Sequence, residues 1–326
     1  MFRISTVIAA AFATLAVMQL GGAKSHAETF PGKPITLIAP FPPGAATDIL
    51  ARIIQPKMAE KLGQPVVVAN PGGAGGSIGT ARLARSPADG YTILVTVNAP
   101  IVMAPFLQAD ISYDPAKDLR GIGLVAESYF TLVVRADSEL KSVEDLIAKA
   151  KANPGAMKFA SAGIGSAHHI AGELLNKNAG INIVHVPYPG GAPAIQDVVG
   201  GHVEIGMGLL PSVHSFVQNG DLKILALIER KPVASQPGLP LLKDIVPGVE
   251  TASWFGMFTP KGTPDDIVAK LSEALTFALA DTATREAIEK LGMTPLGGTP
   301  DEMDQLVVEE LEFWKHAIEL AGIKKQ

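Results

Sequence analysis

The sequence contains no cysteine, and beyond its first residues it has no apolar stretch long enough to span a bilayer. Without cysteine, disulfides, thiolate catalysis and cysteine-ligated metal sites are excluded. Basic residues are also few, because 27 lysines and arginines stand against 32 acidic residues and give a net charge of −5 at pH 7. Nucleic acid and anionic lipid are therefore poor partners for this chain.

What the chain does have is length and apolar content. Its 326 residues are 47% hydrophobic and 18% charged, which is enough for one large core or two ordinary ones. A chain with that much core can fold without disulfides even if it is exported.

The first 27 residues predict a signal peptide. A charged start ending at Arg3 precedes an apolar run, and small residues follow up to Ala27, where we expect cleavage. The apolar run is shorter than the ~20 residues of a spanning helix. Cleavage after Ala27 removes Arg3 and Lys24 and no acidic residue. The remaining chain then has 25 basic and 32 acidic residues, a net charge of −7. The sequence thus predicts export to the periplasm.

From residue 34 the chain alternates short β-branched runs with helical patterns, which is typical of βαβ units. In the first part we expect the strands 35–40, 65–70 and 91–98 and the helices 47–63 and 77–86. One long strand, 123–137, is expected to leave this part of the chain. Near the C-terminus a return strand, 254–260, precedes two long helices, 264–291 and 300–321.

The central part repeats the pattern with its own strands and helices. Its expected strands are 158–163, 181–188, 203–209 and 222–228, and its expected helices are 142–155, 166–180, 192–201 and 211–220. The fold class is therefore α/β with two domains. We expect a discontinuous first lobe, 28–128 plus 252–326, and an inserted second lobe, 129–251. The two crossings between them would form a hinge beside a cleft.

The segment "APFPPGAATDIL" joins the first strand to the first helix. At the carboxyl edge of a parallel sheet, where ligands bind, the amides of a first helical turn point into the crevice. Gly44, Ala45 and Ala46 leave room for a ligand to approach those amides. Pro42 and Pro43 stiffen the loop, and Phe41 can form an apolar wall. The loop alone is equally consistent with an ordinary turn.

A second copy of this design favours a binding site. The segment "FASAGIGSAHH" again runs from a strand through small residues into a helix, with Ser161, Gly163 and Ser166 as donors. Each half of the chain thus offers one anion-receptive helix start, and the two could grip one ligand. Asp48, in the first helical turn, is interpreted as a support of its loop rather than a ligand contact. Ser77 follows a third glycine-rich loop, which could equally be a surface turn.

Other chemistries find less support in the sequence. "GGSIG" matches the G-x-S-x-G pattern of serine hydrolases, but residues 71–76 separate Ser77 from the preceding strand, so an enzyme is not expected. Phosphate-binding loops of the G-x-x-x-x-G-K-[ST] type are absent, and we expect no cofactor. His168 and His169 point about 100° apart on a helix, so no metal site is expected.

Several stretches resemble the Bug family, the periplasmic solute receptors of tripartite tricarboxylate transporters. They include "GKPITLIAPFPPGAATDILAR", "SPADGYTILV", "SAGIGSAHHIAGELL", "VHVPYPGGAPAIQDVVGGHVE" and "SWFGMFTPKGTP", and the likeness extends over about residues 31–326. The resemblance implies a two-lobed clamshell of type II-like architecture that closes on a small organic acid. It implies ligand contacts from Phe41, Gly44, Ala45, Ala46, Ser77, Asn98, Ser161, Gly163, Ser166, His169 and Tyr188.

Two departures from the family pattern bear on the ligand. Leu209 stands where relatives often have a polar residue, and "APIVM" follows Asn98 where small polar residues and histidine are common. If these positions line the pocket, the far end of the ligand should be less polar than citrate or aspartate. We expect a dicarboxylate with an aliphatic or aromatic spacer, or an aromatic monocarboxylate.

The predicted function is a monomeric, non-enzymatic receptor whose lobes close on a carboxylate. Its partners would be the ligand and the two membrane subunits of a tripartite tricarboxylate transporter. Two alternatives remain open at this point. One is a ligand sensor that presents its closed form to a membrane signalling protein, and the other is the serine hydrolase.

Overall fold

The computed structural model describes residues 30–164, 166–188, 190–233 and 236–325. The predicted signal peptide, with its cleavage after Ala27, lies outside the described residues. Contacts group Lys33–Gln326 into one compact unit, and everything below concerns that unit. None of the helices in the described part of the chain combines the length and the hydropathy of a bilayer-spanning segment.

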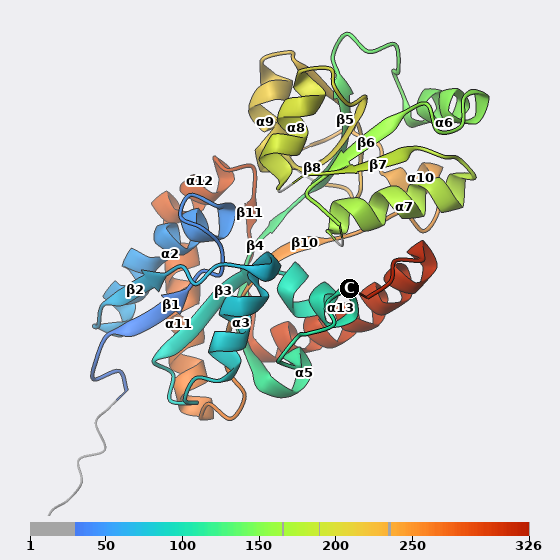
Figure 1. Cartoon of the computed structure of the whole chain (residues 1–326). Coiled ribbons are helices and arrows are strands. Elements are labelled where there is room, and N and C mark those ends of the chain that lie inside the picture. Colours follow the sequence, from blue (N-terminus) through green and yellow to red (C-terminus); the bar gives the residue numbers. More distant parts are fainter. Residues whose placement is uncertain (1–29, 165, 189, 234–235, 326) are drawn as a thin grey trace, which may run out of the picture. The chain divides into compact units, whose positions relative to one another are not determined.

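Two β-sheets organise this unit and confirm the predicted α/β fold class (Figure 1). Both sheets are mixed, whereas the sequence had indicated parallel βαβ units alone. The first sheet has the strand order β11-β4-β10-β3-β1-β2 and consists of β1 (Ile35–Ile38), β2 (Val66–Ala69), β3 (Thr92–Val97), β4 (Leu119–Ser128), β10 (Ser253–Pro260) and β11 (Thr294–Pro295). The second has the order β7-β6-β8-β5-β9 and consists of β5 (Phe130–Arg135), β6 (Lys158–Ser161), β7 (Val184–Pro187), β8 (Ile205–Leu209) and β9 (Leu222–Leu227).

Among the named strands, parallel pairs occur within the βαβ units. β1 pairs with β2 and β3, and β6 pairs with β7 and β8, all in parallel. Each sheet also contains antiparallel pairs. β10 is antiparallel to β3 and β4, and β5 is antiparallel to β8 and β9. Each sheet therefore has one set of parallel strands whose carboxyl ends lie at a common edge.

Helices connect and cover these strands. They are α2 (Ala46–Leu62), α3 (Ser77–Ala84), α4 (Ala104–Leu107), α5 (Pro115–Asp118), α6 (Val143–Ala152), α7 (Ala167–Ala179), α8 (Gly191–Val199), α9 (Leu210–Gln218), α10 (Leu242–Ile245), α11 (Asp265–Ala280), α12 (Thr282–Glu289) and α13 (Pro300–Ala321). A 3₁₀ turn, η1 (Ala74–Gly76), precedes α3, and a π-helical turn, η2 (Ala99–Met103), follows β3.

Two sequence predictions of single long elements are wrong. The expected strand 123–137 is two strands, because the chain leaves the first sheet at Ser128 and enters the second at Phe130. The expected helix 264–291 is interrupted at Asp281, whose extended backbone ends α11 and whose carboxylate caps α12 by accepting from the Thr284 amide at 2.9 Å. In both places a local interruption divides an apolar pattern that continues on either side.

Sheet membership follows the predicted residue ranges. The strands of the first sheet fall within 28–128 and 252–326, and those of the second within 129–251. The chain passes between the sheets at Tyr129 and again over residues 228–252. The division into two separately moving lobes stays a prediction.

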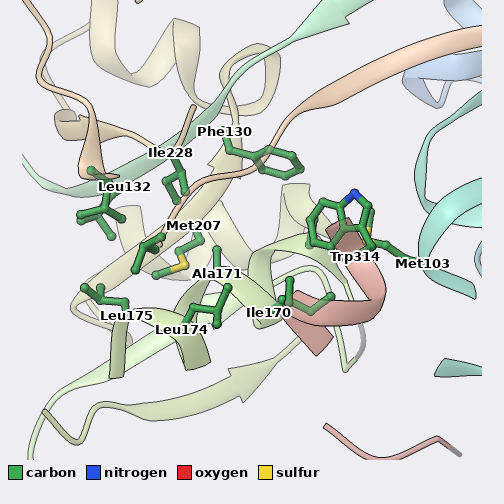
Figure 2. Packing of buried hydrophobic residues seen from close by; sticks show 14 of the residues in the cluster. Met103, Phe130, Leu132, Ile170, Ala171, Leu174, Leu175, Met207, Ile228 and Trp314 are labelled. Carbon is green, nitrogen blue, oxygen red and sulfur yellow. The ribbon is translucent and has the colours of Figure 1, made fainter. Parts of the chain in front are cut away.

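One hydrophobic cluster joins elements of both sheets. Figure 2 shows Phe130 of β5, Met207 of β8 and Ile170 of α7 together with Trp314 of α13 and Met103 of η2. α13 belongs to the chain that follows the first sheet, whereas α7 covers the second. In the described structure α7 and α13 therefore pack against each other.

Candidate functional site

A cavity of about 1000 Å³ lies at the carboxyl ends of parallel strands from both sheets. Residues of the loops after β1, β2 and β3 line it on one side, and residues after β6, β7 and β8 line it on the other. Ligands of open α/β sheets bind at such strand ends. The cavity is therefore the candidate site.

The loop before α2 is held from within by Asp48. The Gly44 amide donates to Asp48 Oδ2 at 2.9 Å, and Asn70 Nδ2 donates to Asp48 Oδ1 at 3.0 Å. Arg52 Nη2 lies 3.0 Å from the same carboxylate. Asn70 Nδ2 also donates to the Phe41 carbonyl at 3.1 Å, so it ties the loop to the neighbouring strand end. Asp48 thus contacts the loop from beneath and is not among the residues that line the cavity.

These contacts also set the charge of Asp48. Burial raises the pKa of its carboxyl group, but the hydrogen bonds from Arg52, Gly44 and Asn70 and the charge of Arg52 lower it more, so that the pKa lies below its ordinary value. Asp48 is therefore ionised at neutral pH, beside the start of α2, where the helix dipole favours a negative charge.

Two of the amides expected to face a ligand are engaged inside this loop. The Gly44 amide binds Asp48, and the Ala45 amide donates to the Pro42 carbonyl at 3.1 Å. The amides of Ala46 and Thr47, the first two residues of α2, have no acceptor within the helix. Both residues line the cavity. The sequence analysis named Ala46 but missed Thr47, although its position in the first turn was a sufficient signal.

Gly44 has a backbone reason to be glycine. Its φ is +84°, in the left-handed region, and a Cβ at this position would meet nothing within 4 Å. The space is open, so the residue is required by the turn and not by close packing.

The loop before α7 is held by neutral groups. Ser166 is the N-cap residue: its hydroxyl accepts from the His169 amide at 3.2 Å and donates to the Gly163 carbonyl at 2.7 Å. Ser161 Oγ accepts from the Gly163 amide at 3.1 Å and lies 2.6 Å from His185 Nε2. Hydroxyl groups and one imidazole therefore hold the loop before α7, whereas the carboxylate of Asp48 holds the loop before α2.

The first two residues of α7 also belong to the cavity lining. Ala167 and His168 follow the N-cap, have no acceptor within the helix for their amides, and line the cavity. The cavity thus lies at the N-termini of two helices, one from each part of the chain. Such amides, together with the positive end of the helix dipole, bind anions.

Charged side chains contribute little to this lining. Among the described residues that line the cavity, Lys324 near the C-terminus is the one with a charged side chain, and it is exposed. His168 is neutral, because burial lowers its pKa to about 4. Besides Lys324, the positively polarised groups of the described lining are backbone amides.

One group of side chains could hold a metal ion. Ligand atoms of His169, Glu173 and His185 all lie within 4.8 Å of one another. The rings of His169 and His185 are stacked with centroids 4.0 Å apart, and His185 Nε2 is engaged with Ser161. Burial, together with the neighbouring His169, lowers the pKa of His185 to about 4. In this arrangement His185 contacts Ser161 and His169 stacks on His185, so the two histidines help to hold the Ser161 loop.

The predicted ligand contacts divide into two groups. Those that line the cavity are Phe41, Gly44, Ala45, Ala46, Asn98, Ser166 and Leu209, and Pro42 joins them. Those that do not are Ser77, Ser161, Gly163, His169 and Tyr188, and Pro43 also lies outside the lining.

Each residue of the second group has a partner elsewhere. Ser77 is buried and its Oγ lies 3.4 Å from the Tyr113 hydroxyl, while the Tyr188 hydroxyl donates to Asp197 Oδ2 at 2.6 Å. Ser161 and His169 engage the contacts of the α7 loop described above. Gly163 has a φ of +115°, and a Cβ there would come within 3.1 Å of the Tyr188 carbonyl. These residues shape the loops that carry the lining.

Ser77 does not sit at a nucleophile elbow. β2 ends at Ala69, and the turn η1 lies between that strand and Ser77, the first residue of α3. A nucleophile elbow places its serine directly after a strand, in a sharp turn. This geometry argues against the hydrolase alternative.

Several lining residues were not predicted from the sequence. Phe130 begins β5 at the passage between the sheets, and Ser253 begins β10, while Phe255 follows on the same strand. Ser253 and Phe255 lie in the quoted stretch "SWFGMFTPKGTP", but no sequence signal assigned them to the site. Their place follows from the pairing of β10 with β3 and β4, and that of Phe130 from the pairing of β5 with β8, which a single sequence does not reveal.

Comparison with known proteins places the chain among transport receptors. Residues 50–323 match the model of the "Tripartite tricarboxylate transporter family receptor". Protein BugT of Bordetella pertussis is 35% identical over an alignment of 326 positions, which covers 99% of this chain and 99% of BugT.

Solved structures agree with this match. The R. palustris protein Rpa4515, solved with adipate, is 32% identical and has a TM-score of 0.81. The match covers 91% of this chain and 100% of Rpa4515. MatC from Rhodopseudomonas palustris, with bound malate, is 30% identical and has a TM-score of 0.77. The match covers 89% of this chain and 100% of MatC. The fold is thus that of periplasmic binding proteins, and the expected family is confirmed.

Proposed function

Because the chain belongs to the family of tripartite tricarboxylate transporter receptors, we propose that it captures one small organic carboxylate in its cavity and delivers it to the membrane subunits of such a transporter. The observation that carries the proposal is the meeting of two helix N-termini at a single cavity. Ala46 and Thr47 of α2 and Ala167 and His168 of α7 present backbone amides to it. A carboxylate between them would accept several hydrogen bonds from groups that have no acceptor within their own helices.

The ligands of the solved relatives support the same class of molecule. Adipate in Rpa4515 and malate in MatC are both small dicarboxylates. The lining of this cavity, with one exposed lysine and no arginine among the described residues, suits a small number of carboxylate groups. A tricarboxylate would leave charge unpaired in a largely apolar site, at a cost of about 1–3 kcal/mol or more.

Capture would use motion about the two passages between the sheets. In the proposal the lobes are 28–128 plus 252–326 and 129–251, and the ligand adds contacts to both when they close. The chain would work as a periplasmic monomer after cleavage behind Ala27, without a cofactor and without catalysis. Phe41 and Leu209 would contact the apolar part of the ligand, and Ser166 would support its carboxylate by capping the helix whose first amides bind it.

A thermal-shift screen of residues 28–326 against small carboxylic acids tests capture. The proposal predicts that at least one acid raises the unfolding temperature, and that calorimetry with that acid gives one site per chain. Stabilisation by no acid in a broad panel, or two independent sites per chain, would contradict it.

Delivery requires a separate measurement. Uptake of the selected acid by membrane vesicles that contain the two transporter subunits should depend on added receptor. The matched control is the same receptor with Ala46→Pro, which lacks one of the proposed ligand amides. Equal uptake with and without the receptor would leave capture intact and contradict delivery.

A further inference from the structure

Three side chains with metal-binding atoms meet between α7 and β7. They are His169 and Glu173 of α7 and His185 of β7, here called the α7–β7 triad. One ligand atom of each lies within 4.8 Å of those of the other two. The triad stands outside the cavity lining, so it has no direct part in the proposed capture of a carboxylate.

The fold brings the triad together from a helix and a strand. His169 and Glu173 are four residues apart on α7, so their side chains share one face of the helix, and His169 Nε2 lies 3.8 Å from Glu173 Oε1. α7 connects β6 to β7, which pair in parallel with Phe159 opposite His185. The second imidazole of the group thus comes from β7, and not from the neighbouring His168.

The triad is partly removed from solvent. The exposed fractions of the His169 and Glu173 side chains are 11% and 29%. Burial lowers the pKa of His169 and of His185, so both imidazoles are neutral at pH 7, which is the form that binds metal. Burial also raises the pKa of the Glu173 carboxyl group. A cation beside this carboxyl group would favour its ionised form.

The donor atoms of the triad suit zinc among the common metal ions. Two imidazole nitrogens and one carboxylate oxygen form the protein part of zinc sites whose fourth position holds water. Calcium takes six to eight oxygen ligands, and magnesium prefers carboxylates and water. The triad offers one carboxylate, so these two ions fit it less well.

Binding requires one ring of the triad to turn. The ring planes of His169 and His185 are 14° apart, and stacked rings cannot both direct a lone pair at one ion. His185 also stacks on Phe159 with centroids 4.9 Å apart, and its Nε2 lies 2.6 Å from Ser161 Oγ. These contacts hold the His185 ring. The ring that turns is therefore that of His169, about its χ2 torsion, whose energy minimum is broad.

We propose that the α7–β7 triad binds one zinc ion, which joins α7 to β7 behind the Ser161 loop. The ion is structural, because its ligands lie outside the cavity lining. The inference revises the sequence expectation of no metal site, which considered two neighbouring histidines of one helix. It goes beyond the proposed function and does not depend on it.

Zinc binding by the untagged chain 28–326, first freed of metal with a chelator, tests the proposal. Calorimetry with zinc chloride alone should give one site per chain, and the ion should raise the unfolding temperature. Glu173→Gln keeps the size of its side chain, and His169→Phe keeps a ring on His185. Each should bind zinc at least about tenfold more weakly, since loss of even a group that only orients a ligand costs that much.

His316→Ala is the matched control. His316 is an exposed histidine of α13, four residues after the exposed Glu312, so the two repeat the helical spacing of His169 and Glu173. Within the described chain they belong to no group of three potential metal ligands. This variant should bind zinc, and be stabilised by it, as the parent is.

Three results would overturn the inference. The first is absence of both binding heat and a rise in unfolding temperature, which would make the triad a packing cluster alone. The second is equal zinc affinity of the parent, Glu173→Gln and His169→Phe, which would place the ion elsewhere. The third is loss of zinc binding in His316→Ala. Carboxylate capture would stand in all three cases, because the thermal-shift screen decides it separately.

Discussion

The loops before α2 and α7 deliver the same groups to the cavity by opposite means. Both place the amides of the first two helical residues in the lining. Before α2 the N-cap residue Ala45 makes no side-chain bond, and the ionised Asp48 holds the loop. Before α7 the neutral hydroxyl of Ser166 is the cap. The two loops therefore share the position of the first helical residues at the cavity. They differ in the side chains that hold each loop.

The difference has a physical consequence. The α2 loop adds a negative charge close to the proposed ligand, but Gly44, Asn70 and Arg52 all direct donors at it. The α7 loop relies on hydroxyl groups and an imidazole with lowered pKa. We therefore expect the two loops to respond differently to acid and to substitution.

The largest effect is expected from Asp48→Ala. It removes the partner of the Gly44 amide, of Asn70 and of Arg52 at once, so the free energy of unfolding should fall by about 2–3 kcal/mol. Denaturant unfolding measures this. Arg52→Ala is the control: its half-exposed side chain should cost less than about 1 kcal/mol. Equal losses in the two variants would contradict the role given to Asp48.

The second largest effect is expected in the dependence of stability on pH, because the α2 loop is held by an ionised carboxylate and the α7 loop is not. The folded-state pKa of Asp48 lies below its ordinary value, so its stabilisation is complete above that ordinary value and is lost as the pH falls through the lowered one. Asp48→Asn should therefore show a smaller decline of stability than the parent between neutral pH and about pH 3. Thermal unfolding across that range is the measurement, and parallel curves would refute the assignment.

Ser166→Ala should have a smaller and more specific effect. Losing the N-cap should cost about 1 kcal/mol of stability and weaken ligand binding by about three- to tenfold. Ser142 caps α6 in the same way by accepting from the Asp145 amide at 3.1 Å, away from the cavity. Ser142→Ala should therefore cost similar stability without loss of affinity. Weaker binding in both variants would show that the effect is global.

The smallest effect is expected from Lys324→Ala. Its exposed ammonium group stands in solvent, so the affinity for a carboxylate should change by less than about threefold and should depend little on salt. Calorimetry at two salt concentrations checks this. A loss of a hundredfold would mean that a lysine, and not the helix amides, neutralises the ligand.

Much of the fold follows from local sequence. Gly63 ends α2 with a φ of +68°, and Ser142 begins α6 as the predicted N-cap. Such signals act within a few residues, which is why the alternation of strands and helices could be predicted. The boundary between the two sets of strands was expected at 128/129, but the interruption of the expected strand 123–137 at Tyr129 was not, because apolar residues continue on both sides.

The site was predictable only as far as it is local. The glycine-rich helix starts pointed to Ala46 and Ser166, which line the cavity. Which amides remain available depends on side chains that bind back, as Asp48 does to Gly44. Ser253 and His168 stand in quoted family stretches, but their places in the lining depend on strand pairing and on helix packing, which those stretches alone do not reveal. The ligand contacts themselves stay a prediction.

Proline substitution at the first residue of a helix tests the central claim most directly. Proline is tolerated there and removes only the amide donor. Ala45 and Ser166, which precede these positions, are already extended, with ψ 157° in both cases. Thr282→Pro, at the exposed start of α12 after extended Asp281, is the control.

Calorimetric titration of these variants with the acid selected by the thermal-shift screen is the deciding measurement. The account predicts that Ala46→Pro and Ala167→Pro each bind at least about tenfold more weakly than the parent, whereas Ala46→Ser and Thr282→Pro bind as the parent does. Parental affinity in folded Ala46→Pro and Ala167→Pro would contradict a carboxylate held by the amides of two helix starts.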